Sequence, residues 1–514
     1  MIRLGIDVGG TNTDGVILSA DNEILASTKS TTTKDIFSGI KQTLNKLMEE
    51  SKLDAEKIDV ATLGTTHCTN AIVERKGLNR VGIIRICLPS GSAVTPLLDW
   101  PQDLVDQLDP VMFLIHGGYE YNGEPIAALE ENELQNVVEK LKGEVDSIAI
   151  TSVFSPVQNK QEKYVAEYLS KAMPEIPISI SSEIGSVGLI ERENATILNA
   201  ALMSTIRHVS EGFQQALGQE GIQAKIFLGQ NDGTLMTNEY AQKYPIYTIA
   251  CGPTNSIRGA AHLTNEPNAI VVDIGGTTTD IGVLANSFPR QTSLAVEVGG
   301  VRTNYRMPDI YSVGFGGGTR IHQKDEGWKV GPDSVGYRLM EEAKSFGGET
   351  LTATDIAIAK GQVRFGEANI DSFKDLPIED IYEIMTHVVE EAIDRMKTNS
   401  EDATVVLVGG GAALMPEALK GASKVIRPAH AGVANAIGAA LGDISGTVER
   451  IYLLENESYE TIMENAKAEA VKNAVAAGAD PDQIQIIQLE DFPLAYLPGQ
   501  ALLVKVKVAG PLKI

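Results

Sequence analysis

Cysteine, basic residues and long apolar runs are all scarce in this chain of 514 residues. Its three cysteines, Cys68, Cys87 and Cys251, make neither a disulfide framework nor a CxxC metal site. Only 43 basic residues face 68 acidic ones, and the net charge of -25 argues against a sequence-independent grip on nucleic acid or an anionic membrane. The longest apolar candidate, 431–442, is shorter than the roughly 20 residues that cross a bilayer.

The composition is otherwise that of a globular protein. Hydrophobic residues make up 43% of the chain and charged residues 22%, so disorder is not expected as the main state. The length predicts two or three domains of ordinary size. The first residues, Met1 to Asp7, contain no signal-peptide core, and we expect a soluble cytoplasmic protein.

Glycine, in contrast, is abundant, with 49 residues, and two of its clusters repeat one design. The octets DVGGTNTD at 7–14 and DIGGTTTD at 273–280 share six of their eight positions. Each octet stands between two short apolar runs, which predicts strand, turn and strand. We interpret the repetition as an internal duplication that gives two related α/β halves, each opening with a β-hairpin.

The octets carry the residue types that bind phosphate and a divalent cation. A tight Gly-Gly turn lets backbone N–H groups point into one concavity, and such nests bind phosphate oxygens. Asp7 and Asp273 stand at strand ends, where a carboxylate can hold Mg²⁺ directly or through its water shell. Asp14 and Asp280 either orient a nucleophile or cap the hairpin turn. The expected phosphate-binding residues are Gly9, Gly10, Thr11, Thr13, Gly275, Gly276, Thr277 and Thr278.

A third glycine cluster is expected to border the nucleoside of a bound nucleotide. The β-branched run 403–408 leads into Gly409, Gly410 and Gly411, and a helix-like stretch follows. The small residues of 431–442 predict a helix that another backbone can approach closely. Competing nucleotide motifs are absent from the sequence, because there is no GxxxxGK[ST] and the third cluster lacks the last glycine of the dinucleotide pattern.

These motifs resemble those of a known superfamily. The two octets and VLVGGGAALMP at 406–416 look like the phosphate-1, phosphate-2 and adenosine elements of the actin/sugar kinase/heat-shock ATPase superfamily. More narrowly, the chain resembles the A subunit of the hydantoinase/oxoprolinase family. The other segments that carry this resemblance, in family order, are 62–77, 154–156, 251–253, 312–318 and 330–332.

The resemblance implies an ATP-dependent enzyme that acts on C–N bonds. Members of the family use ATP to open cyclic amides such as hydantoins and 5-oxoproline, usually with a separate B subunit, and relatives carboxylate acetone. ATP is needed because resonance makes an amide carbonyl a poor electrophile, and phosphorylation of its oxygen lets water attack. The implied cofactors are ATP and Mg²⁺. The implied partners are a small cyclic amide and a B-subunit-like protein, in a homo- or hetero-oligomer.

The amide acceptor is expected to bind directly after the strand 60–63. A compact polar cluster follows that strand, and its His67 can polarise a carbonyl or shuttle a proton, although a satisfied loop histidine is the other interpretation. A glycine run at 316–318 either closes over the ligand or forms a flexible turn. The expected substrate-binding residues are Thr65, Thr66, Asn70, Gly316 and Gly317.

The fold class that follows is α/β. The resemblance implies a duplicated actin-like ATPase (ribonuclease H-like) fold, with two lobes around a nucleotide cleft. We expect the first lobe at 1–190 and the second, with the phosphate-2 and adenosine motifs, at 191–446. A small α+β appendage is expected at 447–514, because the pattern there predicts one helix and two strands.

Two departures from the family pattern leave the substrate open. The segment 88–100 stands where the family has Phe-Arg-Asp and Gly-Arg-Gln residues, and His67 stands where the family is expected to be apolar. The same ATPase fold also serves ATP-driven reactivating chaperones of radical or cobalamin enzymes, and stand-alone small-molecule kinases. Both remain alternatives to the opening of a cyclic amide.

Overall fold

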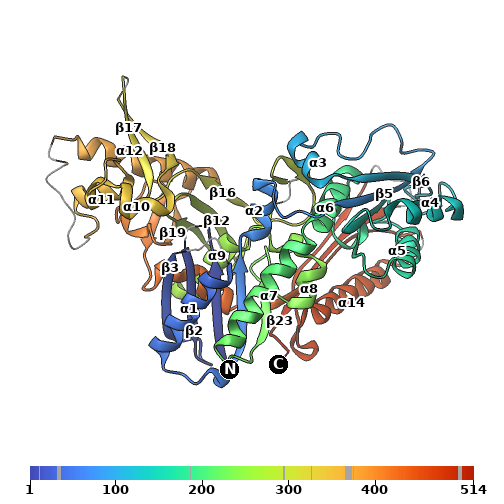
Figure 1. The fold of residues 1–514 in the computed structure, drawn as a ribbon, viewed down its shortest axis with the longest axis horizontal. Helices are drawn as coiled ribbons and strands as arrows, with labels where there is room; N and C mark the ends of the chain where they lie inside the picture. Colours follow the sequence, from blue (N-terminus) through green and yellow to red (C-terminus); the bar gives the residue numbers. More distant parts are fainter. Residues whose placement is uncertain are drawn as a thin grey trace.

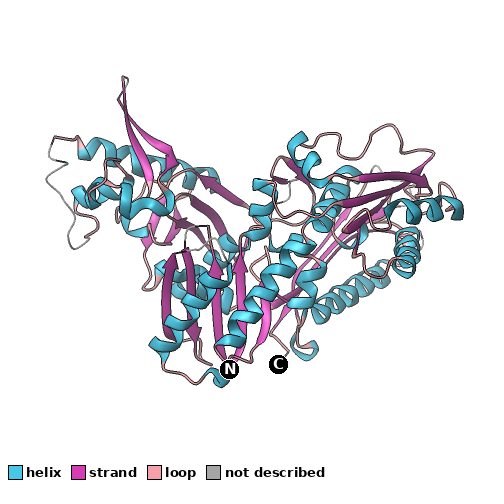
Figure 2. Ribbon diagram, viewed as in Figure 1, coloured by secondary structure: helices cyan, strands magenta, loops and turns pink. Residues whose placement is uncertain are grey.

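The computed structural model describes residues 1–10, 12–31, 36–185, 187–292, 296–325, 327–364, 373, 375–455, 457–495 and 500–513. Within these ranges the chain forms five β-sheets with helices packed around them (Figure 2). Figure 1 shows the residues coloured yellow and orange at one end of the molecule and the teal residues, with the red helix α14, at the other. No helix in the described ranges is long and apolar enough to span a bilayer.

The largest sheet has nine strands and contains the first predicted hairpin. In spatial order, its strands are β22 (Gln485–Pro493), β23 (Ala501–Gly510), β21 (Ile444–Leu453), β10 (Leu235–Thr237), β9 (Lys225–Gly229), β4 (Ile58–Thr65), β1 (Ile2–Val8), β2 (Asn12–Leu18) and β3 (Ile24–Thr31). The helices around it are α1 (Ile36–Ser51), α2 (His67–Glu74), α7 (Met203–Gln219), α8 (Asn238–Lys243), α9 (Cys251–Thr264), α13 (Ala434–Ala440) and α14 (Tyr459–Ala477).

Two glycines let helices pack on opposite faces of this sheet. β1 and β2 pair antiparallel with Ile6 opposite Gly15, so Gly5 and Gly15 point to different faces. A Cβ on Gly5 would overlap α13, and a Cβ on Gly15 would overlap Leu47 of α1. Both glycines therefore permit a close approach that any larger residue would prevent.

The second sheet repeats the design around the second octet. Its strands, in spatial order, are β13 (Phe288–Pro289), β12 (Thr279–Ala285), β11 (Ala269–Ile274), β19 (Ala403–Val408) and β20 (Ala422–Ile426), with β16 (Ile310–Val313) also paired to β12. Asp273 lies opposite Asp280, as Asp7 lies opposite Asp14, and β19 runs parallel to β11 as β4 runs parallel to β1. The helices of this part are α10 (Leu339–Glu342), α11 (Ala353–Lys360) and α12 (Ile378–Met396).

A separate four-stranded parallel sheet lies between α2 and α6 in the chain. Its strands are β6 (Val111–His116), β5 (Val81–Leu88), β7 (Ser147–Ser152) and β8 (Ile178–Ile180). The neighbouring helices are α3 (Gln102–Leu108), α4 (Glu131–Leu141), α5 (Lys160–Ala172) and α6 (Leu189–Ala201). It has its own core of buried side chains, mostly Ile, Leu and Val. Two short ribbons complete the described strands: β14 (Val296–Val298) with β15 (Val301–Thr303), and β17 (Thr319–Lys324) with β18 (Gly327–Ser334).

The last residues of the chain extend the first sheet. β21 and β23 pair along ten residues, and α14 packs on both strands. Strands from each of the expected segments 1–190, 191–446 and 447–514 therefore share one sheet, and the boundaries between these segments stay a prediction. A buried ion pair fastens this extension, because Lys507 Nζ lies 2.9 Å from Asp232 Oδ2 and Ser445 Oγ donates to the same oxygen at 2.8 Å.

The Asp232 pair predicts a pH-dependent stability. Burial alone would raise the pKa of Asp232, but Lys507 and the hydroxyls of Thr234 and Ser445 lower it from 3.8 to about 2. A depressed folded-state pKa contributes stability above the unfolded pKa and loses it as the pH falls towards 2, here roughly 2 kcal/mol. In chemical denaturation, the stability advantage of the wild type over Asp232→Asn should be full at pH 6 and should shrink between pH 4 and pH 2. An advantage that does not change with pH would contradict this account.

Candidate functional site

The two hairpin turns share one backbone hydrogen bond. Gly9 N donates to the carbonyl of Asn12 at 3.0 Å, and Gly275 N donates to the carbonyl of Thr278 at 2.9 Å. Gly10 is exposed, and a Cβ placed on it would meet nothing within 4 Å. The first turn therefore leaves open space beside its backbone N–H groups, as a phosphate nest requires. Thr11 lies outside the described residues.

The carboxylate of Asp7 is held by two amide groups. It is 3% exposed, and it accepts from Asn255 Nδ2 at 3.1 Å and from Asn435 Nδ2 at 2.9 Å. Burial raises the pKa of Asp7 to about 6, the two amides oppose that rise, and the nearby charges of Asp14 and Asp273 add to it. Asp7 thus has polar partners but no cation among the described residues in contact with it.

Asn435 also ties Asp7 to its partner across the hairpin. Its Nδ2 donates to Asp14 Oδ2 at 2.7 Å, and Lys29 on β3 forms an ion pair with the other oxygen of Asp14 at 2.8 Å. Asp14 therefore has a cation beside it, whereas Asp7 does not. The two carboxylates of the first hairpin are chemically different despite their similar burial.

The second hairpin uses hydroxyl groups where the first uses amides. Ser256 Oγ donates to Asp273, and Ser312 Oγ donates to Asp280. Burial raises the pKa of both carboxyls, to about 6 for Asp280, and the charge of Asp273 contributes to that rise. The consecutive residues Asn255 and Ser256 donate to Asp7 and Asp273, so the carboxylates of the two hairpins lie near one another, and the charge of Asp273 adds to the raised pKa of Asp7. We call these four aspartates and the two turns the hairpin site.

One helix reaches both halves of the hairpin site. Asn255 and Ser256 are consecutive residues of α9, and they donate to Asp7 and Asp273 respectively. Sequence reasoning did not identify these two residues or Asn435 as part of the site. The signal available was their place: Asn255 follows the Cys-Gly-Pro segment within two residues, and Asn435 interrupts the small apolar run at 431–442.

The predicted acceptor cluster lies beside the first hairpin. β4 ends level with β1, with Gly64 opposite Asp7 and Thr65 opposite Val8, and Thr66 N donates to the carbonyl of Val8 at 3.3 Å. A Cβ on Gly64 would overlap the Asp7 carboxylate, so glycine is required there. The strand pairing therefore brings the acceptor cluster and Asp7 together.

Within the acceptor cluster, a threonine orients the histidine. His67 Nδ1 lies 2.6 Å from Thr65 Oγ1, and burial lowers the pKa of the imidazole. Asn70 Nδ2 donates to Thr66 Oγ1 at 3.4 Å. The half-buried imidazole is consequently neutral near pH 7 and has a fixed ring position, which suits proton transfer and also suits a satisfied structural histidine.

The third glycine cluster packs directly on the second hairpin. Gly409 has a φ of +84°, and a Cβ there would overlap Asp273 Oδ1. Gly411 N donates to the carbonyl of Ile274 at 2.7 Å, whereas Gly410 is exposed. Only a short 3-10 turn, Ala412–Leu414, follows the cluster in place of a longer helix. The turn is thus next to a candidate metal ligand, with Gly410 left open.

Gly316 and Gly317 lie on the second hairpin turn. Gly317 N donates to the carbonyl of Gly275 at 3.0 Å, Gly318 N donates to Gly276 at 2.7 Å, and Gly316 N donates to Thr319 Oγ1 at 2.7 Å. All three glycines are buried, and a Cβ on Gly316 would sit 2.7 Å from Thr277 N. These glycines therefore pack against the second hairpin turn itself.

Comparison with known proteins identifies the family. Residues 3–173 match the hydantoinase/oxoprolinase N-terminal region, and residues 192–367 match the hydantoinase/oxoprolinase model. The chain belongs to the hydantoinase/oxoprolinase family. Among its relatives, an uncharacterised protein of Methanocaldococcus jannaschii is 27% identical over 397 residues, which cover 71% of this chain and 57% of that protein. The resemblance inferred from the motifs is thereby confirmed.

Characterised members of the family are more distant. Caprolactamase subunit alpha of Pseudomonas jessenii is 24% identical over 388 residues, covering 71% of this chain and 55% of the relative. 5-Oxoprolinase 1 of Arabidopsis thaliana is 25% identical over 409 residues, covering 70% and 31%. The hydantoinase/oxoprolinase chain described here thus matches about half the length, or less, of these curated relatives.

Solved structures confirm the fold class. The ATP-dependent caprolactamase from Pseudomonas jessenii superposes with a TM-score of 0.79 at 19% identity, covering 99% of this chain and 88% of that one. Nucleotide-free acetone carboxylase gives a TM-score of 0.69 at 18% identity, covering 100% and 88%. The α/β architecture with two related hairpins, predicted from the octets, is therefore correct.

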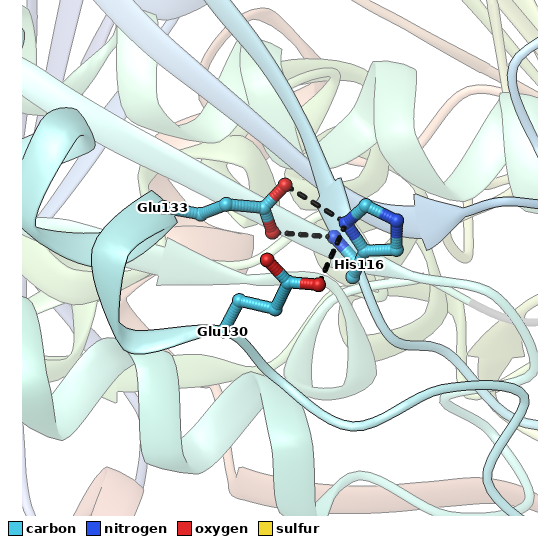
Figure 3. A group of neighbouring side chains, drawn as sticks. All are labelled: His116, Glu130 and Glu133. Atoms are coloured by element: carbon cyan, nitrogen blue, oxygen red, sulfur yellow. Dashed lines mark hydrogen bonds and ion pairs between the residues drawn. The ribbon is translucent and has the colours of Figure 1, made fainter.

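A second polar cluster of this hydantoinase/oxoprolinase chain lies far along the sequence from the hairpin site. His116, Glu130 and Glu133 place one ligand atom each within 4.8 Å of one another (Figure 3). His116 Nδ1 lies 2.9 Å from Glu133, and Glu133 also accepts from the His116 backbone N–H at 2.8 Å. Both glutamates stand at the N-terminus of α4, where carboxylates are stabilised without a metal. An ion pair explains this cluster.

Replacing Gly438 by alanine should force apart the helices α9 and α13, whose residues hold the carboxylates of the hairpin site. A Cβ on Gly438 of α13 would overlap the backbone carbonyl of Asn255 on α9, and neither helix backbone can turn away. We expect a loss of roughly 3 kcal/mol in chemical denaturation, because overpacking of this kind is not relieved by a rotamer change.

Gly212 provides the matched control. It lies inside α7, and a Cβ on it would meet nothing within 4 Å. Gly212→Ala should therefore stabilise the protein by roughly 0.5–1 kcal/mol through helix propensity alone. Similar stabilities for the two alanine variants would show that α9 and α13 do not require their close crossing.

Proposed function

We propose that this chain binds Mg·ATP between its two hairpins and transfers the γ-phosphoryl group to the carbonyl oxygen of a cyclic amide, which activates the ring for opening. The observation that carries the proposal is the pair of matched hairpins whose carboxylates, Asp7 and Asp273, are held by consecutive residues of α9. The names of the relatives that are lactam-opening enzymes, caprolactamase and 5-oxoprolinase, agree with this chemistry.

The residues of the hairpin site fit a divalent cation. Asp7 and Asp273 have raised pKa values because they are buried and lie near other carboxylates, so a bound cation would relieve an unfavourable accumulation of negative charge. Oxygen donors from carboxylates are also the ligands that Mg²⁺ prefers. Asp7 and Asp273 would hold the ion or its waters, and the ion would supply charge neutralisation at the phosphates.

The glycine turns fit the rest of the nucleotide. The first turn, with Gly9, Gly10 and Thr11, would hold phosphate oxygens from one side, and the second turn would hold them from the other. Thr13 is fully buried in β2 and would support the first turn. The corresponding residues of the second turn are Gly275, Gly276, Thr277 and Thr278. Gly410, the exposed member of the third cluster, would border the nucleoside with its neighbours Gly409 and Gly411.

The acceptor cluster would hold the amide at the mouth of the first hairpin. Thr65 is the last residue of β4 and Thr66 follows it, both directly beside Val8, so a carbonyl bound there would lie close to the phosphate turn. Asn70 and the neutral His67 supply hydrogen bonds and a site for a moving proton. Asp280, which has no cation in contact with it among the described residues, remains our candidate to orient the nucleophile, whereas Lys29 and Asn435 give Asp14 a positioning role.

Relatives of this chain are named as subunits, and we infer that it works with a partner in a homo- or hetero-oligomer. The alignments with caprolactamase subunit alpha and with acetone carboxylase beta subunit each cover about 70% of this chain. The partner that we propose is a B-subunit-like protein. We also propose a soluble cytoplasmic location, which the low cysteine content favours.

ADP release in the presence of candidate amides tests the proposed function. The purified chain, alone and with a B-subunit-like protein encoded beside it, would be supplied with Mg·ATP and with hydantoin, 5-oxoproline or caprolactam. Stimulated ADP release together with a ring-opened acid, identified by its mass, is the expected result. A stable phosphorylated product would instead indicate a kinase. A rate of ADP release that no small molecule changes would indicate a chaperone.

Removal of either hairpin carboxylate should abolish most turnover. Asp7→Ala or Asp273→Ala should lower ATP turnover at least about a hundredfold, because a misplaced Mg²⁺ no longer stabilises the developing charge. Asp21→Ala is the control, since Asp21 is an exposed turn residue at the far end of β2. Wild-type turnover in either hairpin variant would exclude the proposed two-hairpin site.

A further inference from the structure

A row of paired residues crosses the first sheet at the level of Asp7. Asp7 on β1 lies opposite Asp14 on β2, and Asp14 lies opposite Lys29 on the neighbouring strand β3 (Figure 1). Because residues directly opposite each other in neighbouring strands point to the same face, these three side chains share one face of the sheet. Lys29 ends the row, with its Nζ 2.8 Å from Asp14 Oδ1.

The second half of the duplicated design carries the same row without the cation. Asp273 lies opposite Asp280, and Asp280 lies opposite Ser312 on β16. Ser312 Oγ donates to Asp280, whereas Lys29 forms an ion pair with Asp14. Lys29 and Ser312 therefore occupy equivalent positions, and the duplication alone does not account for the positive charge in the first half.

The strand that carries Lys29 reaches the boundary between the two halves. β2 and β3 both contact the 3-10 turn Ala431–Val433. The carbonyl of Ala431 accepts from Gly409 N at 2.9 Å, and a Cβ on Gly409 would overlap Asp273 Oδ1. This series of contacts leads from β3 to the second hairpin. In agreement with it, burial raises the pKa of Asp273 and the charge of Lys29 opposes that rise.

The ammonium of Lys29 stays accessible although it is paired. The Lys29 side chain is 36% exposed, whereas that of Asp14 is 4% exposed. An ammonium has three donors, and its described partner is one oxygen of Asp14. The other oxygen of Asp14 accepts from Asn435. Lys29 can therefore contact Asp14 and an anion at the same time.

The charge balance of the hairpin site requires a cation besides the metal. Among the described residues, Lys29 is the only cation that pairs with any of the four aspartates of this site. A triphosphate with bound Mg²⁺ still carries negative charge, which these carboxylates repel. Lysine binds phosphate as a point charge, because its ammonium is compact and fully charged. Lys29 is thus placed to offset the repulsion.

We propose that Lys29 is a phosphate-binding residue of the hairpin site, whose ammonium contacts the terminal phosphate of the nucleotide while it remains beside Asp14. The proposal rests on the proposed function, namely on Mg·ATP binding between the hairpins. Phosphoryl transfer to the acceptor cluster requires the terminal phosphate to face the first hairpin, which is the half that carries Lys29. The ammonium would there stabilise the charge of the transferred group.

Calorimetry on the full chain with Mg²⁺ tests this assignment through binding alone. The probes are ADP and the non-hydrolysable ATP analogue AMPPNP, which differ in the terminal phosphate. Lys29→Met should weaken AMPPNP binding roughly ten- to hundredfold, the effect of one lost contact to a charged group, and ADP binding less than about threefold. Wild-type affinity for AMPPNP in this variant, or an equal loss for both nucleotides, would overturn the proposal.

A second pair of variants separates phosphate binding from support of Asp14. Lys29→Met leaves Asp14 buried without its cation, whereas Asp14→Asn removes the need for one. In the Asp14→Asn background, Lys29→Met should still weaken AMPPNP binding roughly ten- to hundredfold and leave ADP binding nearly unchanged. If the double variant binds AMPPNP as tightly as Asp14→Asn alone, Lys29 serves only Asp14 and the proposal is wrong.

Lys46→Met is the matched control. Lys46 on α1 is exposed, and it donates to Ser30 Oγ at 3.1 Å. Ser30 follows Lys29 in β3, so its side chain points to the opposite face of the sheet. Lys46→Met removes the same charge from that face and should leave the binding of both nucleotides unchanged. A loss of AMPPNP binding equal to that of Lys29→Met would indicate a general charge effect and contradict a direct contact.

ADP release with amides, measured on the same preparations, distinguishes the two proposals. If amides stimulate ADP release while Lys29→Met binds AMPPNP like the wild type, the assignment of Lys29 is wrong and the proposed function stands. If Lys29→Met selectively loses AMPPNP while no amide stimulates ADP release, Lys29 stands as a phosphate-binding residue and the proposed ring opening fails. A wild type that binds neither nucleotide would overturn both proposals.

Discussion

The close crossing of α9 and α13 is the constraint on which the rest of the structure depends. A Cβ on Gly259 would overlap the backbone of Ala434, and one on Gly438 would overlap the backbone of Asn255. Because the two helices touch backbone to backbone, Asn255 and Asn435 both reach Asp7. The next residue of α9, Ser256, reaches Asp273 of the other hairpin. Small residues in two helices thereby set the distance between two sheets.

This arrangement concentrates negative charge where a cation is needed. Burial and mutual proximity raise the pKa values of Asp7, Asp273 and Asp280, so the ligand-free site holds carboxylates in an unfavourable environment. Amide and hydroxyl donors reduce that cost without neutralising the charge, which a buried lysine would have done. Asp14 shows the contrast, since Lys29 compensates it. The fold accepts a local loss of stability at the positions that would bind Mg²⁺.

The sequence permitted prediction of those features that local chemistry determines. Both octets formed hairpins with matching registers, because a Gly-Gly turn between β-branched runs has few other conformations. Asn255 and Ser256 were not predicted, because the sequence around a polar helix residue does not indicate which strand its side chain will contact. The run 316–318 was interpreted as a loop over a ligand or a flexible turn, and only the tertiary structure shows it packed on the second turn. Strand partners of β21–β23 were likewise invisible to periodicity, which reports faces and not neighbours.

The chemistry of the hairpin site explains why its polar partners are amides and hydroxyls. A triphosphate with its metal requires exposed N–H groups and carboxylates without a paired cation. Gly10 is exposed, and Asp7 has no cation in contact with it among the described residues. A lysine beside Asp7 would neutralise the charge that is to hold Mg²⁺, whereas Asn255 and Asn435 fix the carboxylate and leave its charge in place.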